Sequence, residues 1–333
     1  MSGTGSRLGR LAAILALLLV MGAAAGWFWL DASFRTPGPS GQETTVEIPR
    51  GEGVRGIARR LESAGLVQNA LLFEATTRIF GGERPLKAGE YSFPPGASIA
   101  AIVLQLQEGR VLVRRLTVPE GLTVAEIMAL VAAEPNLVGD LPPSPPEGRL
   151  LPETYNFVKG DSRADLIRRM SAAMDRLLAE LLPGAAANLP YGGENQVLTL
   201  ASIVEKETGI AAERPRVAGL FVNRLRAGMR LQSDPTVTYG ITRGERSLGR
   251  ELTRADLDAP TPYNTYAISA LPPGPIANPG RASIEAVLHP LATDEFYFVA
   301  DGTGGHAFAR TLDEHNANVR RWRALKRGGG EAP

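Results

Sequence analysis

The chain has 333 residues, with 36 basic and 35 acidic side chains and a net charge of +1 at pH 7. Such a balance excludes the strong basic field typical of nucleic-acid-binding proteins, so no nucleic-acid partner is expected. The absence of cysteine excludes disulfides, thiol catalysis and thiolate metal sites. The length is sufficient for two or three small domains.

The N-terminal segment contains an uncharged apolar run, Leu11–Leu30. At about 1.5 Å per residue a helix of this length spans roughly 30 Å, the thickness of a bilayer core. Arg7 and Arg10 precede the run, so the positive-inside rule predicts a cytoplasmic tail over residues 1–10. A signal peptide cleaved near Gly22–Gly26 is the alternative, but the apolar run continues past that site. We therefore expect an uncleaved anchor at 11–30, with the body of the protein outside the cytoplasm.

A linker rich in Pro, Gly and Ser is expected over residues 31–45. After it, three stretches share the pattern apolar-Pro-x-Gly-x-x-aliphatic-x-x-Ile, beginning at Ile48, Phe93 and Val118. Each predicts a strand end, a turn enforced by Pro and Gly, and the first turns of an amphipathic helix. Because Pro-x-Gly is a common turn sequence, convergent turn chemistry is the alternative explanation of the repeat.

A Pro-rich connection, Leu141–Phe157, leads into a second region. In this region Ser162–Leu182 predicts an amphipathic helix, and Asn195 is a possible N-cap of the next helix. The stretch FYFVADGTGGHAF (296–308) predicts a strand, a glycine turn and a return strand. A short basic helix with a solvated face follows, and residues 328–333 are expected to be a disordered tail.

The stretch LASIVEKETG (200–209) places two glutamates at the end of an apolar run. In a helix, Glu205 and Glu207 are about 200° apart, so they flank the apolar face on opposite sides and cannot both address one site. A carboxyl group partly buried among aliphatic side chains has a raised pKa, which a general acid needs at neutral pH. The angular count slightly favours Glu207 as the more buried. A surface "EKE" without chemistry is the alternative.

Five motifs together resemble the YceG-like family, the MltG-type endolytic murein transglycosylases: EGRLLPETY, LASIVEKET, FVNRLRAGMRLQSDPTVTYG, APTPYNTYAISALPPGPIANPG and FYFVADGTGGHAF. They extend over roughly residues 45–325. The resemblance implies a membrane-anchored bacterial enzyme that cuts nascent peptidoglycan strands internally. It also implies an α+β fold, with a LysM-like α/β subdomain, placed at 46–140, and a mixed α/β catalytic domain, placed at 141–327.

The same resemblance assigns the catalytic acid to Glu207, with Glu205 open as an alternative or an assisting neighbour. A lytic transglycosylase needs a single acid because the C6 hydroxyl of MurNAc attacks its own C1, giving a 1,6-anhydro end. Amide, hydroxyl and aromatic groups near the motifs are expected to bind the sugar, although core packing is the alternative for each tyrosine. The residues expected to bind substrate are Glu205, Asn223, Arg224, Gln232, Ser233, Asp234, Tyr239, Tyr263, Asn264, Thr265 and Tyr266.

No metal or other cofactor is expected, because His289, His306 and His315 show no ligand spacing. Two other functions stay open. One is a non-catalytic peptidoglycan-binding scaffold, and the other is a muramidase that uses water and a second carboxylate, with Asp234 and Glu153 as candidates. The expected partners are peptidoglycan glycan strands and a glycan synthase, whose products the enzyme would terminate.

Overall fold

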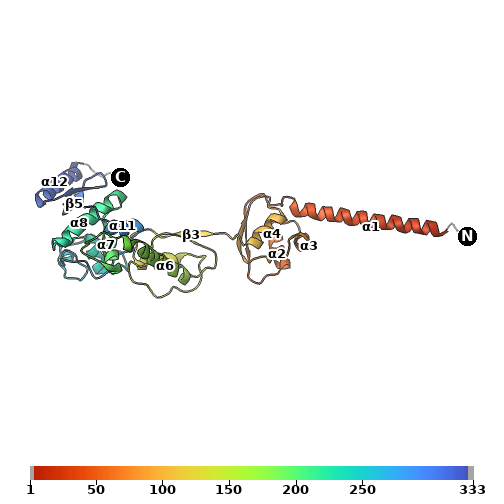
Figure 1. The fold of residues 1–333 in the computed structure, drawn as a ribbon, viewed down its shortest axis with the longest axis horizontal. Helices are drawn as coiled ribbons and strands as arrows, with labels where there is room; N and C mark the ends of the chain where they lie inside the picture. The colour runs from red at the N-terminus through yellow and green to blue at the C-terminus, as the bar shows by residue number, and fades with distance from the viewer. Residues whose placement is uncertain (1–3, 329–333) are drawn as a thin grey trace. The chain divides into compact units, whose positions relative to one another are not determined.

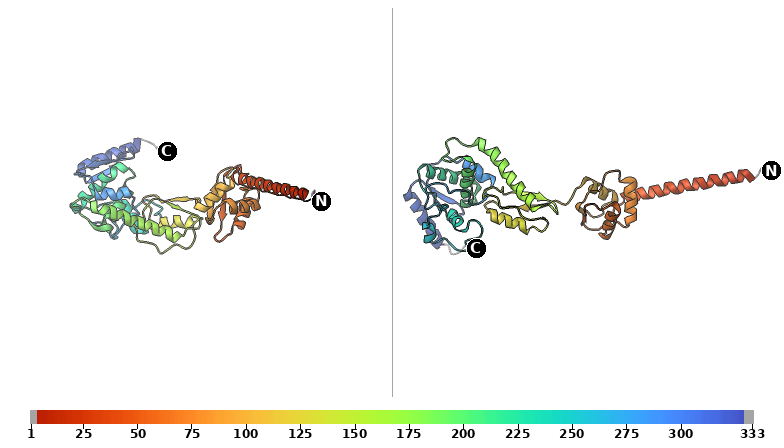
Figure 2. Two further views of the ribbon diagram at one scale, coloured as in Figure 1. Left: turned by 45° about the vertical axis from the view of Figure 1, so that its right-hand side comes forward. Right: turned by 90° about the horizontal axis from the view of Figure 1, so that it is seen from below.

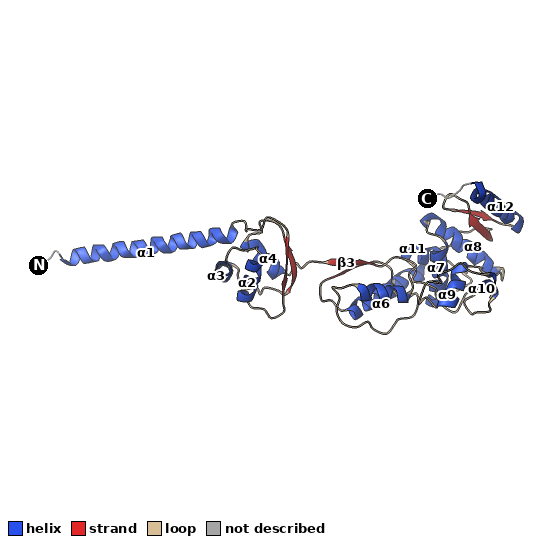
Figure 3. Ribbon diagram, turned by 180° about the vertical axis from the view of Figure 1, so that it is seen from behind, coloured by secondary structure: helices blue, strands red, loops and turns tan. Residues whose placement is uncertain are grey.

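The structure is a computed structural model that describes residues 4–328. The chain divides into two compact units, an N-terminal unit ending at Arg114 and a C-terminal unit beginning at Arg115. In the described residues the strands form three two-stranded sheets, and helices supply most of the regular structure (Figure 3). The fold is therefore mixed α and β. The tail expected at 328–333 lies at and beyond the end of the described residues.

The N-terminal unit begins with one long helix (Figure 1). Its elements are α1 (Thr4–Arg35), β1 (Thr44–Ile48), α2 (Val54–Ser63), α3 (Ala70–Phe80), β2 (Gly89–Phe93) and α4 (Ile99–Glu108). Within α1, Gly9–Arg35 is long and apolar enough to cross a membrane, by length and composition. The helix continues through the first residues of the expected linker. There Phe34 is buried and its ring lies 5.6 Å from that of Phe80, so the end of α1 belongs to this unit's core.

β1 and β2 pair antiparallel, with Thr44 opposite Phe93 and Ile48 opposite Gly89. Buried side chains from both strands, including Ile48 and Tyr91, pack against α2, α3 and α4. Alternate residues of a strand point to the same face, so β1 and β2 each direct apolar side chains toward the helices.

The C-terminal unit is mainly helical, and Figure 2 gives two further views of it. Its elements are β3 (Arg114–Thr117, which crosses the division), α5 (Val124–Ala133), β4 (Thr154–Phe157), α6 (Arg163–Leu181), η1 (Leu182–Gly184), α7 (Gly193–Glu207), η2 (Ala211–Glu213), α8 (Arg214–Arg226), α9 (Asp234–Thr242), α10 (Arg254–Asp258), α11 (Arg281–Leu288), β5 (Tyr297–Ala300), β6 (His306–Ala309) and α12 (Leu312–Gly328). The predicted helix at 162–182 and the predicted hairpin at 296–308 are both confirmed, as α6 and as the antiparallel pair β5–β6.

The three Pro-x-Gly stretches fold as the pattern predicts. β1 leads to α2, β2 to α4 and β3 to α5, each through a turn. Gly51, Gly96 and Gly121 have φ values of 80°, 69° and 76°, in the left-handed region that favours glycine. The repeat therefore reflects one local strand-turn-helix solution used three times.

The division after Arg114 falls earlier than the boundary expected near residue 140. β3 pairs with β4, and Val118 donates its N–H to the Glu153 carbonyl at 3.0 Å. Side chains of α5, such as Ile127, share a core with Leu166 and Met170 of α6. The third strand-turn-helix stretch thus packs with the C-terminal unit, because its apolar partners come later in the chain.

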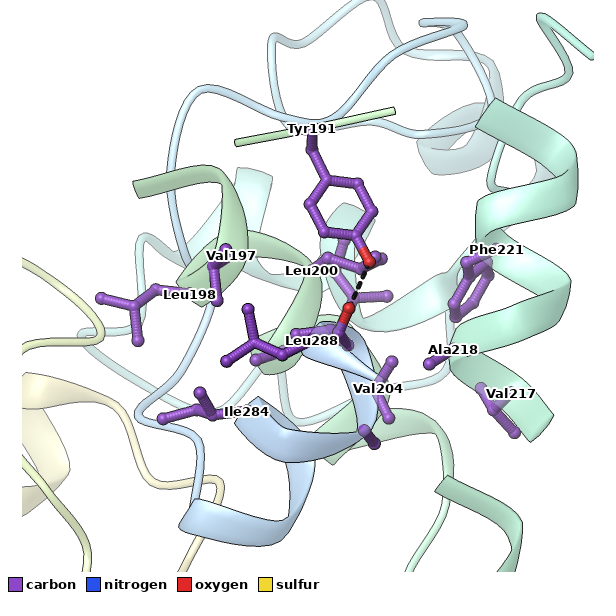
Figure 4. Close-up of a cluster of buried hydrophobic side chains, with 14 of the residues drawn as sticks. Tyr191, Val197, Leu198, Leu200, Val204, Val217, Ala218, Phe221, Ile284 and Leu288 are labelled. Atoms are coloured by element: carbon purple, nitrogen blue, oxygen red, sulfur yellow. Dashed lines mark hydrogen bonds between the residues drawn. The ribbon is translucent and has the colours of Figure 1, made fainter. Parts of the chain in front are cut away.

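The main core of the C-terminal unit surrounds α7 (Figure 4). α7 packs against α8 and α11, and the Tyr191 hydroxyl donates to the Val287 carbonyl at 2.6 Å. Two polar residues of α7, Thr199 and Ser202, are also buried. Thr199 donates to a carbonyl of the preceding turn, and Ser202 accepts the Ile276 N–H, so both hydroxyl groups are satisfied inside the core. α7 is therefore enclosed over residues 197–204.

Candidate active site

Glu207 is the last residue of α7 and follows the buried part of that helix, residues 197–204. The Ser233 hydroxyl donates a hydrogen bond of 2.5 Å to Oε1 of Glu207. Oε2 has no hydrogen-bond partner among the described residues. Because Ser233 occupies Oε1 as a donor, a proton on this carboxyl group would reside on Oε2, the oxygen left available to a ligand.

The surroundings of Glu207 favour its protonated form. Burial raises the pKa of this carboxyl group and is the largest effect on it. The Ser233 hydrogen bond opposes that increase, the negative charge of Asp234 adds to it, and His306 and Arg224 reduce it. The net result is a pKa above the ordinary glutamate value, as expected for a general acid.

Ser233 is held by the backbone just before α9. Its N–H donates to Thr265 Oγ1 at 2.9 Å, and its carbonyl accepts the Thr236 hydroxyl at 2.6 Å. Gln232, one residue earlier, has φ 55°, in the left-handed region, and its N–H donates to the Thr265 carbonyl at 3.1 Å. Thr265 is fully buried. These bonds make the Gln232–Ser233 turn a fixed support for Glu207.

Asn223 and Arg224 lie on α8, which packs against α7. Both Asn223 Nδ2 hydrogen bonds go to backbone carbonyls, of Thr293 at 2.8 Å and Glu295 at 3.0 Å. Buried Arg224 donates from Nε to the Phe296 carbonyl at 2.6 Å and from Nη1 to the Leu231 carbonyl at 2.8 Å. In this structure the two side chains therefore hold the backbone of residues 293–296, and Arg224 also holds residue 231, two positions before Ser233.

Some of the remaining residues predicted to bind substrate are accessible to solvent, and others are enclosed in the core. Asp234 is exposed at the start of α9 and accepts the Tyr266 hydroxyl at 2.7 Å. The rings of Tyr239 and Tyr263 lie 4.9 Å apart, and both are half-buried. Asn264 is instead fully buried, and Nδ2 donates to three backbone carbonyls, those of Asp256, Leu257 and Ala259.

Glu205 occupies a different environment from Glu207. Its Oε1 lies 3.0 Å from Nη2 of Arg214, and its Oε2 accepts the Gly280 N–H at 3.0 Å. The side chains of Glu205 and Arg214 are only 5% and 10% exposed. Both oxygens of Glu205 are therefore committed to the protein, which separates it from the site that Glu207 faces, as the helical angle predicted.

Two residues near the site, Glu147 and Glu213, were not singled out from the sequence. Glu147 accepts the Val124 N–H at 2.8 Å and the Asn278 side-chain amide at 3.0 Å, joining the start of α5 to a loop before α11. The His306 ring contacts Glu213 at 2.7 Å between Nδ1 and Oε2. Glu147 does lie in the EGRLLPETY motif, but no spacing rule indicates its partners.

A pocket of about 550 Å³ adjoins this region. Lys206 and Asp234, the neighbours in sequence of Glu207 and Ser233, contribute to its lining together with Tyr239. Among the described residues there is no group of three or more His, Asp or Glu side chains able to hold a metal ion. The chemistry available at Glu207 is therefore that of a single carboxyl group close to this pocket.

Comparison with known proteins identifies the class to which this fold and site belong. The sequence profile of the YceG-like family matches residues 46–321, and the chain belongs to that family. A crystal structure of a YceG-like protein from Listeria monocytogenes is 34% identical, with a TM-score of 0.52, over 84% of this chain and 99% of that one.

Two relatives carry the name endolytic murein transglycosylase. The protein from Bacillus subtilis strain 168 is 31% identical over 90% of this chain and 89% of its own length. That from Streptococcus pneumoniae strain D39 is 31% identical over 92% of this chain. The match spans only 63% of the length of the Streptococcus pneumoniae protein, so that relative is considerably longer.

Proposed function

We propose that this chain is an endolytic murein transglycosylase that cleaves the MurNAc–GlcNAc bond inside peptidoglycan strands and leaves 1,6-anhydro-MurNAc ends. The observation that carries the proposal is the half-buried Glu207, whose pKa is raised by burial and whose Oε2 is available to a ligand. The names of the relatives from Bacillus subtilis and Streptococcus pneumoniae support the same activity.

The proposed reaction uses Glu207 twice. The proton on Oε2 passes to the glycosidic oxygen, the bond from that oxygen to MurNAc C1 breaks, and the GlcNAc leaves as an alcohol. The MurNAc C6 hydroxyl then bonds to C1 and returns its proton to the Glu207 carboxylate. The Ser233 hydroxyl supports the carboxylate between the two steps. The nucleophile belongs to the substrate, so it acts at high effective molarity and no water is consumed.

The remaining parts of the chain fit a role at the membrane. α1 would anchor the protein, with Arg7 and Arg10 on the cytoplasmic side and the catalytic part outside. Of the expected region 46–140, the part within the N-terminal unit, residues 46–114, would bind glycan as a LysM-like subdomain. The antiparallel pairing of β1 with β2, with α2 and α3 between them in sequence, supports this assignment. Cleavage of new strands would terminate elongation beside a synthase, and recovery of no synthase after mild crosslinking and co-purification would count against that partner.

Hydrolysis is the second candidate, and Asp234 is the observation that favours it. A muramidase needs a second carboxylate to activate water. Asp234 is exposed, and its negative charge raises the pKa of Glu207. However, Asp234 already accepts the Tyr266 hydroxyl, and an intramolecular nucleophile makes a base on water unnecessary.

The test is mass spectrometry of the products released from purified glycan strands by the full-length chain and by Glu207→Gln. We expect anhydro-MurNAc ends from the wild type and none from the variant. Reducing MurNAc ends would establish the hydrolase instead, and Asp234→Asn would then be the variant to examine. Strand binding without cleavage by the wild type would favour the non-catalytic scaffold.

A further inference from the structure

The pocket beside Glu207 has three walls. One is the start of α5, with Thr123 and Glu126, and another is a face of α9 that includes Thr238 and Tyr239. The third is the loop after α9, residues 244–250. At about 550 Å³ the pocket has the size of sites that enclose a drug-sized ligand. It is therefore larger than a single carboxylate or hydroxyl group requires.

The loop that forms the third wall is fixed at both ends. Gly244 has φ 74°, and its carbonyl accepts the Thr123 hydroxyl at 2.7 Å. A Cβ added at Gly244 would lie 3.0 Å from both Thr123 and Tyr239, so the backbone approaches this wall closely. At the other end, Arg250 makes hydrogen bonds of 2.6 and 3.0 Å to Asp256. The loop thus presents the residues between these ends from a defined position.

Two cations of the pocket lack a carboxylate partner among the described residues. Arg246 makes no described hydrogen bond or ion pair, and Lys206 makes one hydrogen bond, to the Gly121 carbonyl at 3.3 Å. The acidic side chains in the lining are engaged elsewhere. Glu126 accepts the Thr123 N–H at 2.8 Å in a capping box, and Asp234 accepts the Tyr266 hydroxyl. The free hydrogen-bond donors therefore suit a ligand carboxylate.

We propose that this pocket is a subsite for the stem peptide of peptidoglycan, with Arg246 and Lys206 binding a carboxylate of the peptide. The inference rests on the proposed function, which places MurNAc beside Glu207. The peptide is attached to the lactyl group of that same sugar, and it brings several residues and at least one carboxylate close to the reacting bond. Removal of the peptide leaves a lactyl carboxylate, which shares the charge but fills far less of the pocket.

The experiment compares binding of two uncrosslinked glycan preparations, one with stem peptides and one from which an amidase has removed them. Binding is measured with the full-length Glu207→Gln chain, so the result does not depend on cleavage. We expect about tenfold tighter binding of the peptide-bearing strands, and loss of that preference in Arg246→Gln and in Lys206→Gln, because each removes a charge-assisted hydrogen bond. Arg323→Gln, which changes an exposed arginine of α12 without a carboxylate partner in the described chain, should keep the preference.

Each other outcome contradicts the subsite. Equal binding of both preparations, or an equal loss on both in Arg246→Gln, would mean that the cations serve the glycan or the fold. Tighter binding of the peptide-free strands would assign the cations to the lactyl carboxylate. The proposed function fails separately, if the wild-type chain releases no anhydro ends from either preparation.

Discussion

The contrast between Glu205 and Glu207 predicts that substitution of Glu205 lowers the stability of the fold, whereas substitution of Glu207 abolishes strand cleavage. Glu205→Gln keeps an oxygen for the Gly280 N–H but removes the charge that faces Arg214 at 3.0 Å. A hydrogen bond to a charged group contributes about 1.5–3 kcal/mol, and breaking a buried ion pair costs about 3–5 kcal/mol. Among the described residues Arg214 then has one carboxylate partner, Glu120, which lies 3.3 Å away and is 43% exposed, and Nε of Arg214 is already buried without a partner.

We therefore expect Glu205→Gln to lower the free energy of unfolding of the C-terminal unit by about 3 kcal/mol. For a unit of this size that corresponds to a fall in Tm of roughly 6–12 °C. Calorimetry of the full-length chain, with the transitions of the two units resolved, measures the change. Glu194→Gln is the matched control, because Glu194 also lies on α7 but pairs with Arg149 at the surface, where such a pair contributes under about 1 kcal/mol.

Glu207→Gln should show the opposite behaviour. Burial disfavours the Glu207 carboxylate, and a neutral glutamine can still accept the Ser233 hydroxyl, so Tm should be unchanged or higher while cleavage is lost. The reasoning is refuted if Glu205→Gln melts like the wild type but loses cleavage well below its Tm. It is equally refuted if Glu207→Gln still cleaves strands.

Two further predictions follow from single contacts. Ser233→Ala removes a hydrogen bond that lowers the Glu207 pKa, so we expect that pKa to rise further. The alkaline limb of the pH–kcat/KM profile should then move to higher pH, and a move to lower pH would contradict the assigned acid. Phe34→Ala removes a buried ring of the N-terminal unit and should cost about 3 kcal/mol in a calorimetric melt, whereas Phe28→Ala, which changes a 72% exposed ring of α1, should leave that unit's Tm unchanged.

The local structure of this chain could be predicted where a turn or a helix cap is determined by residues a few positions apart. The Pro-x-Gly stretches predict strand, turn and helix because Gly51, Gly96 and Gly121 supply the left-handed turn residue that the sequence itself encodes. Ser98 and Thr123 then cap the helices they precede, as their side chains do in many proteins.

Cap assignment failed where tertiary contacts decide it. The sequence suggests Asn195 as a possible N-cap of α7, but that helix begins at Gly193 with Gly192 as its cap. The Asn195 side chain instead donates to the Pro273 carbonyl at 3.1 Å, a partner 78 residues later. A polar residue near a helix start is therefore a cap only if no distant acceptor competes for it.

The choice between the two glutamates also depends on contacts with residues that are distant in sequence. Helical geometry alone predicts that Glu205 and Glu207 face different directions, but it cannot say which direction holds a counter-charge. Arg214 supplies that charge to Glu205 from the following helix, and Ser233 supplies a neutral hydroxyl to Glu207 from a turn 26 residues away. No periodicity within residues 197–208 contains this information.

The end of α7 carries one glutamate that holds the helix in place and a second that can act as an acid. The ion pair with Arg214 and the bond to Gly280 fix the end of α7 through Glu205. Glu207, two residues later, is thereby held in position without an ion-pair partner among the described residues, and burial outweighs the more distant charges of His306 and Arg224 and raises its pKa. An acid on a helix end without such support would not keep its place beside the substrate.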